Sequence, residues 1–351
     1  MAYEIKREPE DFMVEEITPE KNVLEIGKKY KFKEGQGDQL ICVLQKRNWD
    51  TNLAISEIAN RLFVSRKRIG FAGTKDKRAV TTQRISLWRI KNVDKLFIKD
   101  MILTPLEESD ERIELGDLWG NRFTIKVYTK KKPKATKKVP NFFGVQRFGE
   151  TRPITHLVGK QIVLGDFEGA VKMYLVKVFP RESKEAKEAR RKLAKKWDYE
   201  EALKRYPMGL RFERTLLGHL AQNENDYIGA LRKLPKFLKM MFVHAYQSYL
   251  FNEFLKEVIK KKKKYKTGPL FGFESKIENK LEEAVLKREK MGLNDFFIRS
   301  MPEMSSRGET RKLFIDLKDF KVMEKGKGYY VVRFSLPKGC YATTVIDYLF
   351  S

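Results

Sequence analysis

The pattern of apolar and polar residues changes twice along this chain of 351 residues. Over about the first 130 residues it predicts short strands, because brief runs of β-branched and aromatic residues alternate with turn residues. The strands expected here are 11–17, 39–46, 68–73, 84–90 and a pair within 112–128. One helix is expected at 50–65, where apolar residues recur at helical spacing and Asp50 or Thr51 is available as the N-cap.

Helical spacing dominates from about Ile154 onward, and strands return after about Glu303. The expected helices are 166–179, 183–197, 226–234, 236–264 and 280–292, and the expected late strands are 311–325 and 328–337. A chain of this length can form one large domain or two ordinary ones. The order of strands, helices and strands predicts an α+β protein with one sheet domain, 1–153 and 304–351, interrupted by an inserted helical domain, 154–303.

The charge balance indicates a polyanionic partner. Lys and Arg number 73 against 47 Asp and Glu, which gives a net charge of +26. Nucleic acid is the first partner to consider for such a chain. A surface adapted to high temperature would also be rich in Lys and Glu, but it would not explain the excess of one sign. Three dense basic runs could contact phosphates or could simply be solvated surface: 130–138, 187–196 and 260–266.

Several common functions are not supported by the sequence. No apolar run of about 18 residues is present, and the N-terminus has no apolar segment of the kind found in secretory signals, so neither a membrane span nor a signal is expected. Cys42 and Cys340 form no CxxC pair, which favours a reducing, cytoplasmic location. The three histidines lack zinc-helix spacing, so no metal site is expected: His156, His219 and His244. The segments 73–75 and 35–37 do not complete a phosphate loop or a dinucleotide fingerprint.

The segment AGTKDKRAVTTQ, residues 72–83, contains a single acid, Asp76, between two lysines. The glycine and the following β-branched residues predict that Asp76 lies at a turn between two strands. Neighbouring cations would keep its carboxylate ionised. Such a group repels phosphate, so on an RNA-binding surface it needs another task, either as a nucleophile or as a contact to a base edge. The alternative is a turn aspartate that accepts hydrogen bonds from its own backbone.

Together with that segment, two others resemble the TruD family of pseudouridine synthases: PNFFGVQRFG at 140–149 and LPKGCYAT at 336–343. PEDFMVEE at 9–16 and HAYQSYLFNEFL at 244–255 also match, in the order of the family and across almost the whole chain. The resemblance implies an enzyme that isomerises uridine to pseudouridine in RNA, typically at position 13 of tRNA, without cofactor or metal. It also implies a mixed, mainly antiparallel sheet with flanking helices, interrupted by a mostly helical family-specific insertion.

The resemblance assigns roles to three residues of the N-terminal segments. Asp76 matches the catalytic aspartate, and Lys6 matches a basic residue near it. Phe12 matches an aromatic residue that contacts the substrate. An ionised aspartate can attack the sugar or the uracil ring, and the sequence does not distinguish the two.

Three further residues are assigned to substrate binding by the same resemblance. Asn141 and Phe143 match the NxFG motif, in which the Phe143 ring would stack on the target uracil. Tyr341 lies where the family has Phe or Tyr against the substrate. An aromatic platform would compensate for the stacking that the base loses when it leaves its helix.

The alternative function, from another class, is a non-catalytic RNA-binding protein or RNA chaperone on the same fold. In both cases tRNA or another RNA is the expected partner, and neither a membrane nor an obligate protein partner is expected. Asp76 distinguishes the two hypotheses, because a protein that only binds RNA gains nothing from a carboxylate that faces phosphate.

Overall fold

A computed structural model describes residues 3–93 and 96–351. Residues 1 and 2, which belong to the N-terminal segment analysed for a secretory signal, lie outside the described residues. The chain divides into two compact units. Unit 1 comprises Met1–Val139 and Ile315–Ser351, and unit 2 comprises Pro140–Phe314. Unit 2 thus also includes residues 140–153 and 304–314, which the sequence prediction places in the sheet domain. The assignment of one unit as catalytic and the other as an insertion stays a prediction.

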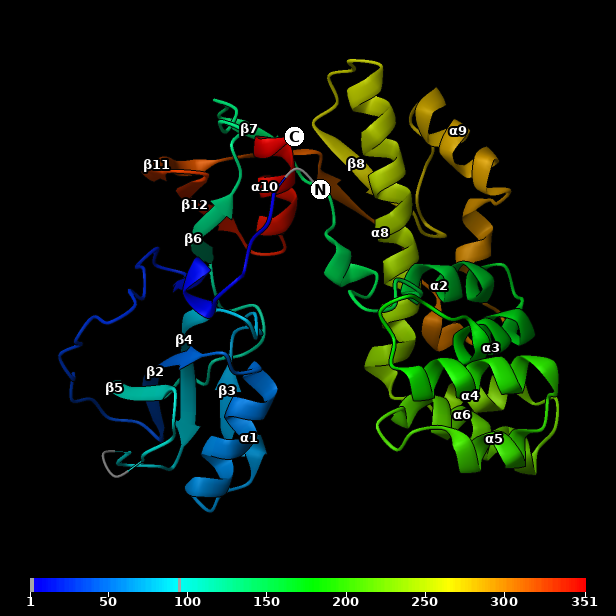
Figure 1. The fold of residues 1–351 in the computed structure, drawn as a ribbon, viewed down its shortest axis with the longest axis horizontal. Coiled ribbons are helices and arrows are strands. Elements are labelled where there is room, and N and C mark those ends of the chain that lie inside the picture. Colours follow the sequence, from blue (N-terminus) through cyan, green and yellow to red (C-terminus); the bar gives the residue numbers. More distant parts are fainter. Residues whose placement is uncertain (1–2, 94–95) are drawn as a thin grey trace. The chain divides into compact units, whose positions relative to one another are not determined.

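Unit 1 is built on an eight-stranded sheet (Figure 1). Its strands are β1 (Phe12–Ile17), β2 (Gln39–Arg47), β3 (Ile69–Phe71), β4 (Val80–Trp88), β5 (Met101–Ser109), β6 (Gly120–Tyr128), β11 (Lys318–Gly326) and β12 (Tyr329–Pro337). The order is β11-β12-β6-β1-β4-β2-β5, with β3 paired to β4. The β1–β4 pair is parallel and the other pairs are antiparallel. The expected α+β fold with a mixed, mainly antiparallel sheet is confirmed.

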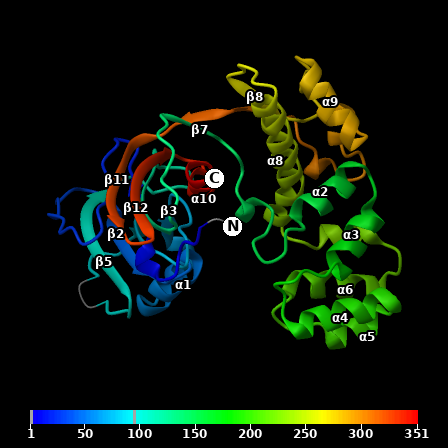
Figure 2. The ribbon, with the colours of Figure 1, turned by 45° about the horizontal axis from the view of Figure 1, so that its top comes forward.

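Two helices pack against one face of this sheet, each over one half of it. Helix α10 (Ala342–Phe350) shares a core with inward residues of β1, β6 and β12, among them Phe12 and Phe123. Helix α1 (Thr51–Arg61) packs on β2, β3 and β4. Figure 2 shows β11 and β12 curving around α10. Strand alternation explains this arrangement, because every second residue of a strand points to the same face.

Unit 1 differs from the expectations in several elements. The region 112–128 forms one strand, β6, rather than two, because 112–119 is occupied by turns around Gly116. Strand β5 and helix α10 were not expected. Short 3-10 helices occur at Pro9–Asp11 (η1) and Arg66–Arg68 (η2).

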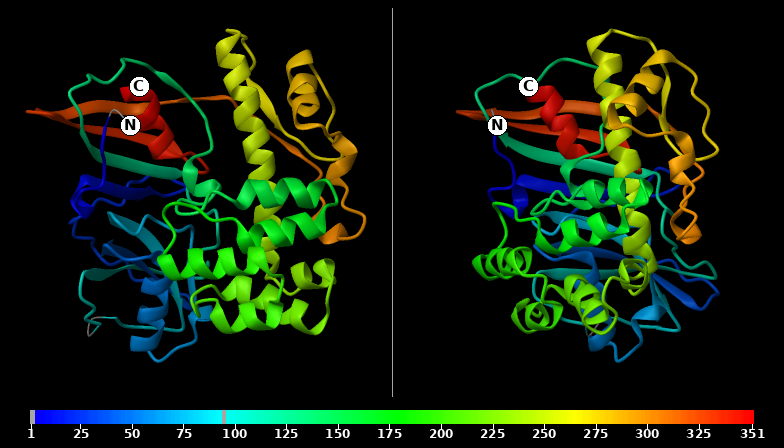
Figure 3. Two further views of the ribbon diagram at one scale, coloured as in Figure 1. Left: turned by 45° about the vertical axis from the view of Figure 1, so that its right-hand side comes forward. Right: turned by 90° about the vertical axis from the view of Figure 1, so that its right-hand side faces the viewer.

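Unit 2 is mostly helical and is organised around α8, a helix of 25 residues that is yellow-green in Figure 3. Its α-helices are α2 (Thr155–Val163), α3 (Phe167–Val176), α4 (Lys184–Lys195), α5 (Tyr199–Arg205), α6 (Arg211–Gln222), α7 (Tyr227–Arg232), α8 (Lys236–Lys260) and α9 (Lys280–Glu289). The 3-10 turns are η3 (Val145–Arg147), η4 (Leu293–Phe296) and η5 (Pro302–Met304). Strands β8 (Thr267–Leu270) and β9 (Glu309–Lys312) form a two-stranded sheet. The five helices expected in this region are present as α3, α4, α7, α8 and α9, whereas α2, α5 and α6 were not expected.

The chain passes from one unit to the other twice, and the two crossing segments pair with each other. These segments are β7 (Lys138–Pro140) and β10 (Phe314–Asp316). Across the described residues, no helix combines the length and apolar character needed to cross a membrane.

Candidate active site

Asp76 lies in the loop that joins β3 to β4, as the turn pattern predicts. Its side chain is one third exposed, and Oδ1 accepts a hydrogen bond of 2.5 Å from Lys6 Nζ. The carboxylate therefore pairs with a cation from a distant segment rather than with a backbone donor of its own loop. This favours a role beyond turn formation.

Lys6 is placed by an unusual backbone conformation. Its φ is +60°, a left-handed geometry that side-chain-bearing residues seldom adopt. The ammonium nitrogen lies 4.0 Å from the centroid of the Phe12 ring while it pairs with Asp76. Phe12 itself is only 1% exposed and belongs to the core under α10. The structure thus brings Asp76, Lys6 and Phe12 together, with the aromatic ring as a support for the cation.

The loop that carries the aspartate is anchored at several points. The backbone N–H of Lys75 donates to Thr51 Oγ1 (2.9 Å), and the side-chain amide of Gln83 donates to the carbonyl of Gly73 (3.0 Å). The Lys75 side chain points inward and forms a buried ion pair with Glu16, at 2.8 Å. These contacts fix the loop from both sides and limit the motion of the carboxylate between them.

Lys46, on β2, is a further anchor that the sequence analysis did not identify. Its side chain is buried, at 0% exposure for the residue, and Nζ donates to the carbonyls of Asp76 (3.0 Å) and Trp49 (2.7 Å). Burial lowers the pKa of Lys46 to about 8, and the nearby Asp76 carboxylate partly opposes this effect. The inward alternation of Cys42, Leu44 and Lys46 is the sequence signal that could have identified it.

Tyr341 is in unit 1 at the N-cap position of α10. Its carbonyl accepts from the Thr344 hydroxyl (2.8 Å), and its side chain is partly exposed. Helix α10 shares the core that contains Phe12, so Tyr341 is positioned by the same packing that supports Lys6.

Asn141 and Phe143 belong to unit 2, where they form a second group. The Asn141 amide donates to the carbonyl of Lys312 (2.8 Å), and its Oδ1 accepts from Arg311 Nη2 (2.7 Å). Arg311 in turn lies over the Phe143 ring, with 4.1 Å between Cζ and the ring centroid. Asn141 is buried, at 4% exposure for the residue, and its side chain holds the guanidinium that covers Phe143.

The backbone of Phe143 is clamped by Asn252 of α8. Asn252 accepts from the Phe143 N–H (2.9 Å) and donates to its carbonyl (3.0 Å). Phe251, the neighbouring residue, packs edge-on against the Phe143 ring at 5.6 Å between centroids. The segments NFFGVQRFG and HAYQSYLFNEFL are therefore in contact, and neither Arg311 nor Asn252 was identified as a site residue from sequence.

The described histidines and cysteines do not form a metal-binding cluster. Throughout 3–93 and 96–351, no group of three or more His, Cys, Asp or Glu residues could hold a metal ion. His156 stacks on Tyr249, with 5.2 Å between ring centroids, and burial lowers its pKa to about 4. Among the described residues, Cys42 and Cys340 form no disulfide with each other.

Comparison with known proteins gives one consistent result. The family model for tRNA pseudouridine synthase D (TruD) matches residues 1–267 and 256–348. A protein named as a probable tRNA pseudouridine synthase D from Methanosarcina barkeri is 39% identical over 414 residues, covering 98% of this chain and 92% of that one. Its counterpart from Methanopyrus kandleri is 40% identical over 341 residues, covering 89% and 85%. The crystal structure of a protein assigned as TruD from Methanosarcina mazei matches with a TM-score of 0.79 and 36% identity, covering 99% of this chain and 93% of that one.

Proposed function

This chain belongs to the TruD family of tRNA pseudouridine synthases and is an isomerase, and we propose that it converts the uridine at position 13 of tRNA to pseudouridine with Asp76 as nucleophile. The observation that supports this assignment best is the Lys6–Asp76 pair, with its 2.5 Å contact in a firmly anchored loop. A protein that only binds RNA has no need for a carboxylate held in this way.

The reaction rearranges bonds without adding or removing atoms. The bond between uracil N1 and ribose C1′ breaks, the base turns, C5 bonds to C1′, and the proton on C5 is released while N1 gains one. In one route an Asp76 oxygen bonds to C1′ as uracil leaves with the electron pair, and this O–C1′ bond breaks when C5 attacks C1′. In the other route the oxygen adds to the uracil ring, and the bond between Asp76 and the ring breaks again after C5 has bonded to C1′, which frees the carboxylate. Both routes require an ionised carboxylate with a fixed direction of attack.

Lys6 supplies that direction. Its ammonium balances the charge of the carboxylate and holds Oδ1, so that the other oxygen, Oδ2, is available to react. The Phe12 ring fixes Lys6 from the other side, which is how we assign Phe12 a part in the site. Lys46 and Thr51 hold the backbone beneath.

The uracil must stay bound after it detaches and while it rotates. In unit 1 we assign this task to Tyr341, since an aromatic face contributes about 1 to 3 kcal/mol per stacked base. The stacking role expected of Phe143, which belongs to unit 2, stays a prediction. Asn141 acts with Phe143 by fixing Arg311 over its ring.

The test is incubation of the purified protein with an unmodified tRNA transcript, followed by carbodiimide mapping of pseudouridine. Wild type should give product at position 13, whereas Asp76→Asn and Asp76→Ala should bind the transcript and give none. Asp38→Asn, at an exposed ion pair with Arg89, is the matched control and should keep full activity. Product from the Asp76 variants at the wild-type rate would remove Asp76 from the mechanism, and no product from wild type would favour a non-catalytic RNA-binding role.

We also propose that the enzyme works in the cytoplasm, where tRNA is available for modification. The low cysteine content, two residues without a CxxC pair, supports a reducing compartment.

A further inference from the structure

The sheet face of unit 1 opposite α10 contains a hollow of about 490 Å³ that no step above uses. Its wall combines residues of β1, β6, β11 and β12 with residues of the loop after β1 and with Trp119, which precedes β6. Five cationic residues and one indole are in this wall: Lys21, Arg122, Lys318, Lys321, Arg333 and Trp119.

Strand register places the hollow on the far side from α10. Phe123 and Phe334 point into the core under α10. Arg122 and Arg333 are each one position away from those phenylalanines, and successive side chains of a strand point to opposite faces. Arg122 also lies directly across from Glu15, and its guanidinium pairs with that carboxylate at 2.6 Å.

A β-bulge in β11 adds a second lysine to the same face. Lys318 pairs with Ser335 and Lys321 pairs with Arg333, so three steps on β11 correspond to two on β12. In a regular strand Lys318 and Lys321 would point to opposite faces. The extra residue reverses one of them, with Asp319 in a left-handed conformation at φ +55°. Both lysines therefore line the hollow.

The positive charge of the hollow is largely uncompensated. Asp319 is the acidic side chain among the residues that line it. Arg122 pairs with Glu15 and Glu25. In the part of the chain that the structure describes, the other four cations of the hollow have no carboxylate within ion-pair distance: Lys21, Lys318, Lys321 and Arg333. A surface of this kind attracts phosphate and loses that attraction as salt rises.

Trp119 adds a rigid aromatic platform. Its backbone is held on both sides, since its N–H donates to the Ile17 carbonyl (3.0 Å) and its carbonyl accepts from the Lys338 N–H (2.9 Å). The ring is partly exposed, with Lys318 Nζ 4.9 Å from its centroid. A flat ring between cations is the combination that binds single-stranded nucleic acid, because bases stack on the ring and phosphates pair with the cations.

A stripe of cations and aromatic rings continues from the hollow toward Asp76. Lys126 of β6 is on the same face as Arg122, and its Nζ is 4.1 Å from the Tyr329 ring centroid. Tyr128, two residues further along β6, lies under Arg7 with 3.8 Å between Cζ and the ring centroid. Arg7 lies two residues before η1 and directly follows Lys6, the partner of Asp76.

We propose that this hollow binds an unpaired nucleotide of the tRNA substrate outside the target uridine, with its base on Trp119 and its phosphate at Lys321 and Arg333. The stripe along β6 then tracks the RNA backbone toward the catalytic loop. The proposal rests on the proposed function, because it concerns the same RNA substrate.

The experiment compares KM and kcat for a full-length unmodified tRNA transcript and for a short stem-loop that carries only the target uridine and its arm. We expect Trp119→Leu to raise KM for the full transcript about tenfold through lost stacking, with kcat within twofold of wild type. Trp119→Phe, which keeps a flat ring, should restore most of the affinity.

Lys321→Ala changes an exposed side chain and should make the salt dependence of tRNA binding shallower. The matched control, Lys91→Ala, should behave as wild type. The KM for the stem-loop should be the same in all variants.

Other results would overturn the RNA site in the hollow, the role of Trp119 in it, or the proposed function itself. If wild type makes pseudouridine and Trp119→Leu and Lys321→Ala both bind the transcript as wild type does, the hollow is not an RNA site and the proposed function stands. If Trp119→Leu weakens the stem-loop equally, the residue acts on the fold or on the catalytic loop. If Trp119→Leu does not fold, Lys321→Ala decides, since its side chain is exposed. If wild type makes no pseudouridine, the proposed function itself fails.

Discussion

Lys46 holds Asp76 mainly through its backbone, because the Lys46 ammonium donates a hydrogen bond to the Asp76 carbonyl. A buried ammonium group is costly unless it is hydrogen-bonded, and here it donates to two carbonyls, one of which belongs to the nucleophile proposed above. The arrangement connects the stability of β2 to the position of the loop that carries Asp76. Removal of the amine would leave both carbonyls without this donor.

The pKa of Lys46 gives a prediction for stability against pH. Its folded-state pKa is about 8, below the ordinary lysine value of 10.5. Below pH 8 both the folded and the unfolded state hold the proton, so this group adds no pH dependence. Between about pH 8 and 10.5 the unfolded state binds the proton and the folded state does not, so this group makes the free energy of unfolding rise with pH. The contribution over that window is on the order of 3 kcal/mol.

Lys46→Met tests this, because methionine has a similar length and no titratable group. The difference in free energy of unfolding between wild type and variant, from urea titrations at pH 7.5 and above, should increase toward pH 10.5. Taking the difference between the two proteins cancels the contribution of all other titrating groups. An exposed substitution, Lys91→Met, should give a flat difference, and a flat difference for Lys46→Met would contradict the burial of its amine.

For individual residues, the sequence predicts the pattern of charges better than the direction in which a side chain points. The turn at Asp76 follows from a glycine and a change in residue type, and its role follows from the family resemblance. Lys46 was missed because a lysine near the end of a strand is usually solvated. Only tertiary packing decides that this one points inward with Leu44.

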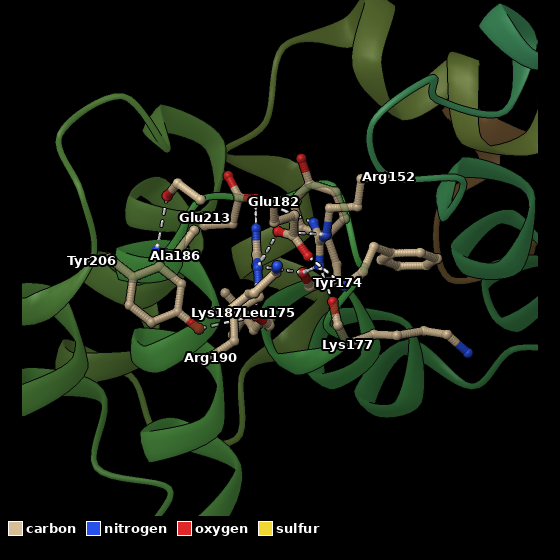
Figure 4. Close-up of polar contacts among 12 residues, drawn as sticks. Arg152, Tyr174, Leu175, Lys177, Glu182, Ala186, Lys187, Arg190, Tyr206 and Glu213 are labelled. Carbon is tan, nitrogen blue, oxygen red and sulfur yellow. Dashed lines mark hydrogen bonds and ion pairs between the residues drawn. The ribbon is translucent and has the colours of Figure 1, made fainter.

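Among the elements of unit 2, helices α3, α4 and α6 are joined by a buried ionic cluster (Figure 4). Arg190 of α4 is 0% exposed and pairs with Glu213 of α6 at 2.8 Å and with Glu182 at 2.7 Å. It also donates to the Leu175 carbonyl of α3 at 2.6 Å. Arg152 adds a second guanidinium to Glu213, at 3.2 Å. One carboxylate thus serves two buried cations.

Glu213→Gln should lower the free energy of unfolding by about 3 kcal/mol or more, because the shape is kept while two buried guanidinium groups lose a counter-charge. Urea unfolding followed by far-UV circular dichroism would measure this. Glu201→Gln, which removes an exposed partner of Arg205, is the control and should change stability by less than about 1 kcal/mol. Equal effects of the two substitutions would show that the cluster contributes no more than a surface pair.

The elements that the sequence missed have physical reasons. Helix α10 is short and its sequence, ATTVIDYLF, is rich in β-branched residues, so its helical state depends on packing against β6 and β12. Strand β5 contains Pro105 and lies at the edge of the sheet, where proline is tolerated. The run 112–119 resembles a strand in composition, but Gly116, at φ +101°, turns the chain.

For the whole molecule, the outline of a sheet built from both ends of the chain could be predicted, but its boundaries could not. The crossing points are 139/140 and 314/315, where β7 and β10 pair. Residues 140–153 have no strong periodicity of their own. They belong to unit 2 because Asn141 and Phe143 bond to β9 and α8, contacts that join positions more than 100 residues apart.

The excess positive charge is also a property of the whole chain, and it predicts how binding responds to salt. With a net charge of +26, most of the affinity for tRNA should come from phosphate contacts that release counterions. If about six or more phosphates are neutralised, the association constant should fall by roughly 10³-fold between 50 and 200 mM salt. Filter binding of an unmodified transcript over that range measures the slope.

Asp76→Asn is the informative variant, because the Asp76 carboxylate contributes repulsion rather than a phosphate contact. The affinity of this variant for the transcript should be equal to or slightly higher than that of wild type, with an unchanged salt slope. A slope near that of one or two contacts would contradict the charge argument, and weaker binding by Asp76→Asn would mean that the carboxylate itself contacts the RNA in the bound state.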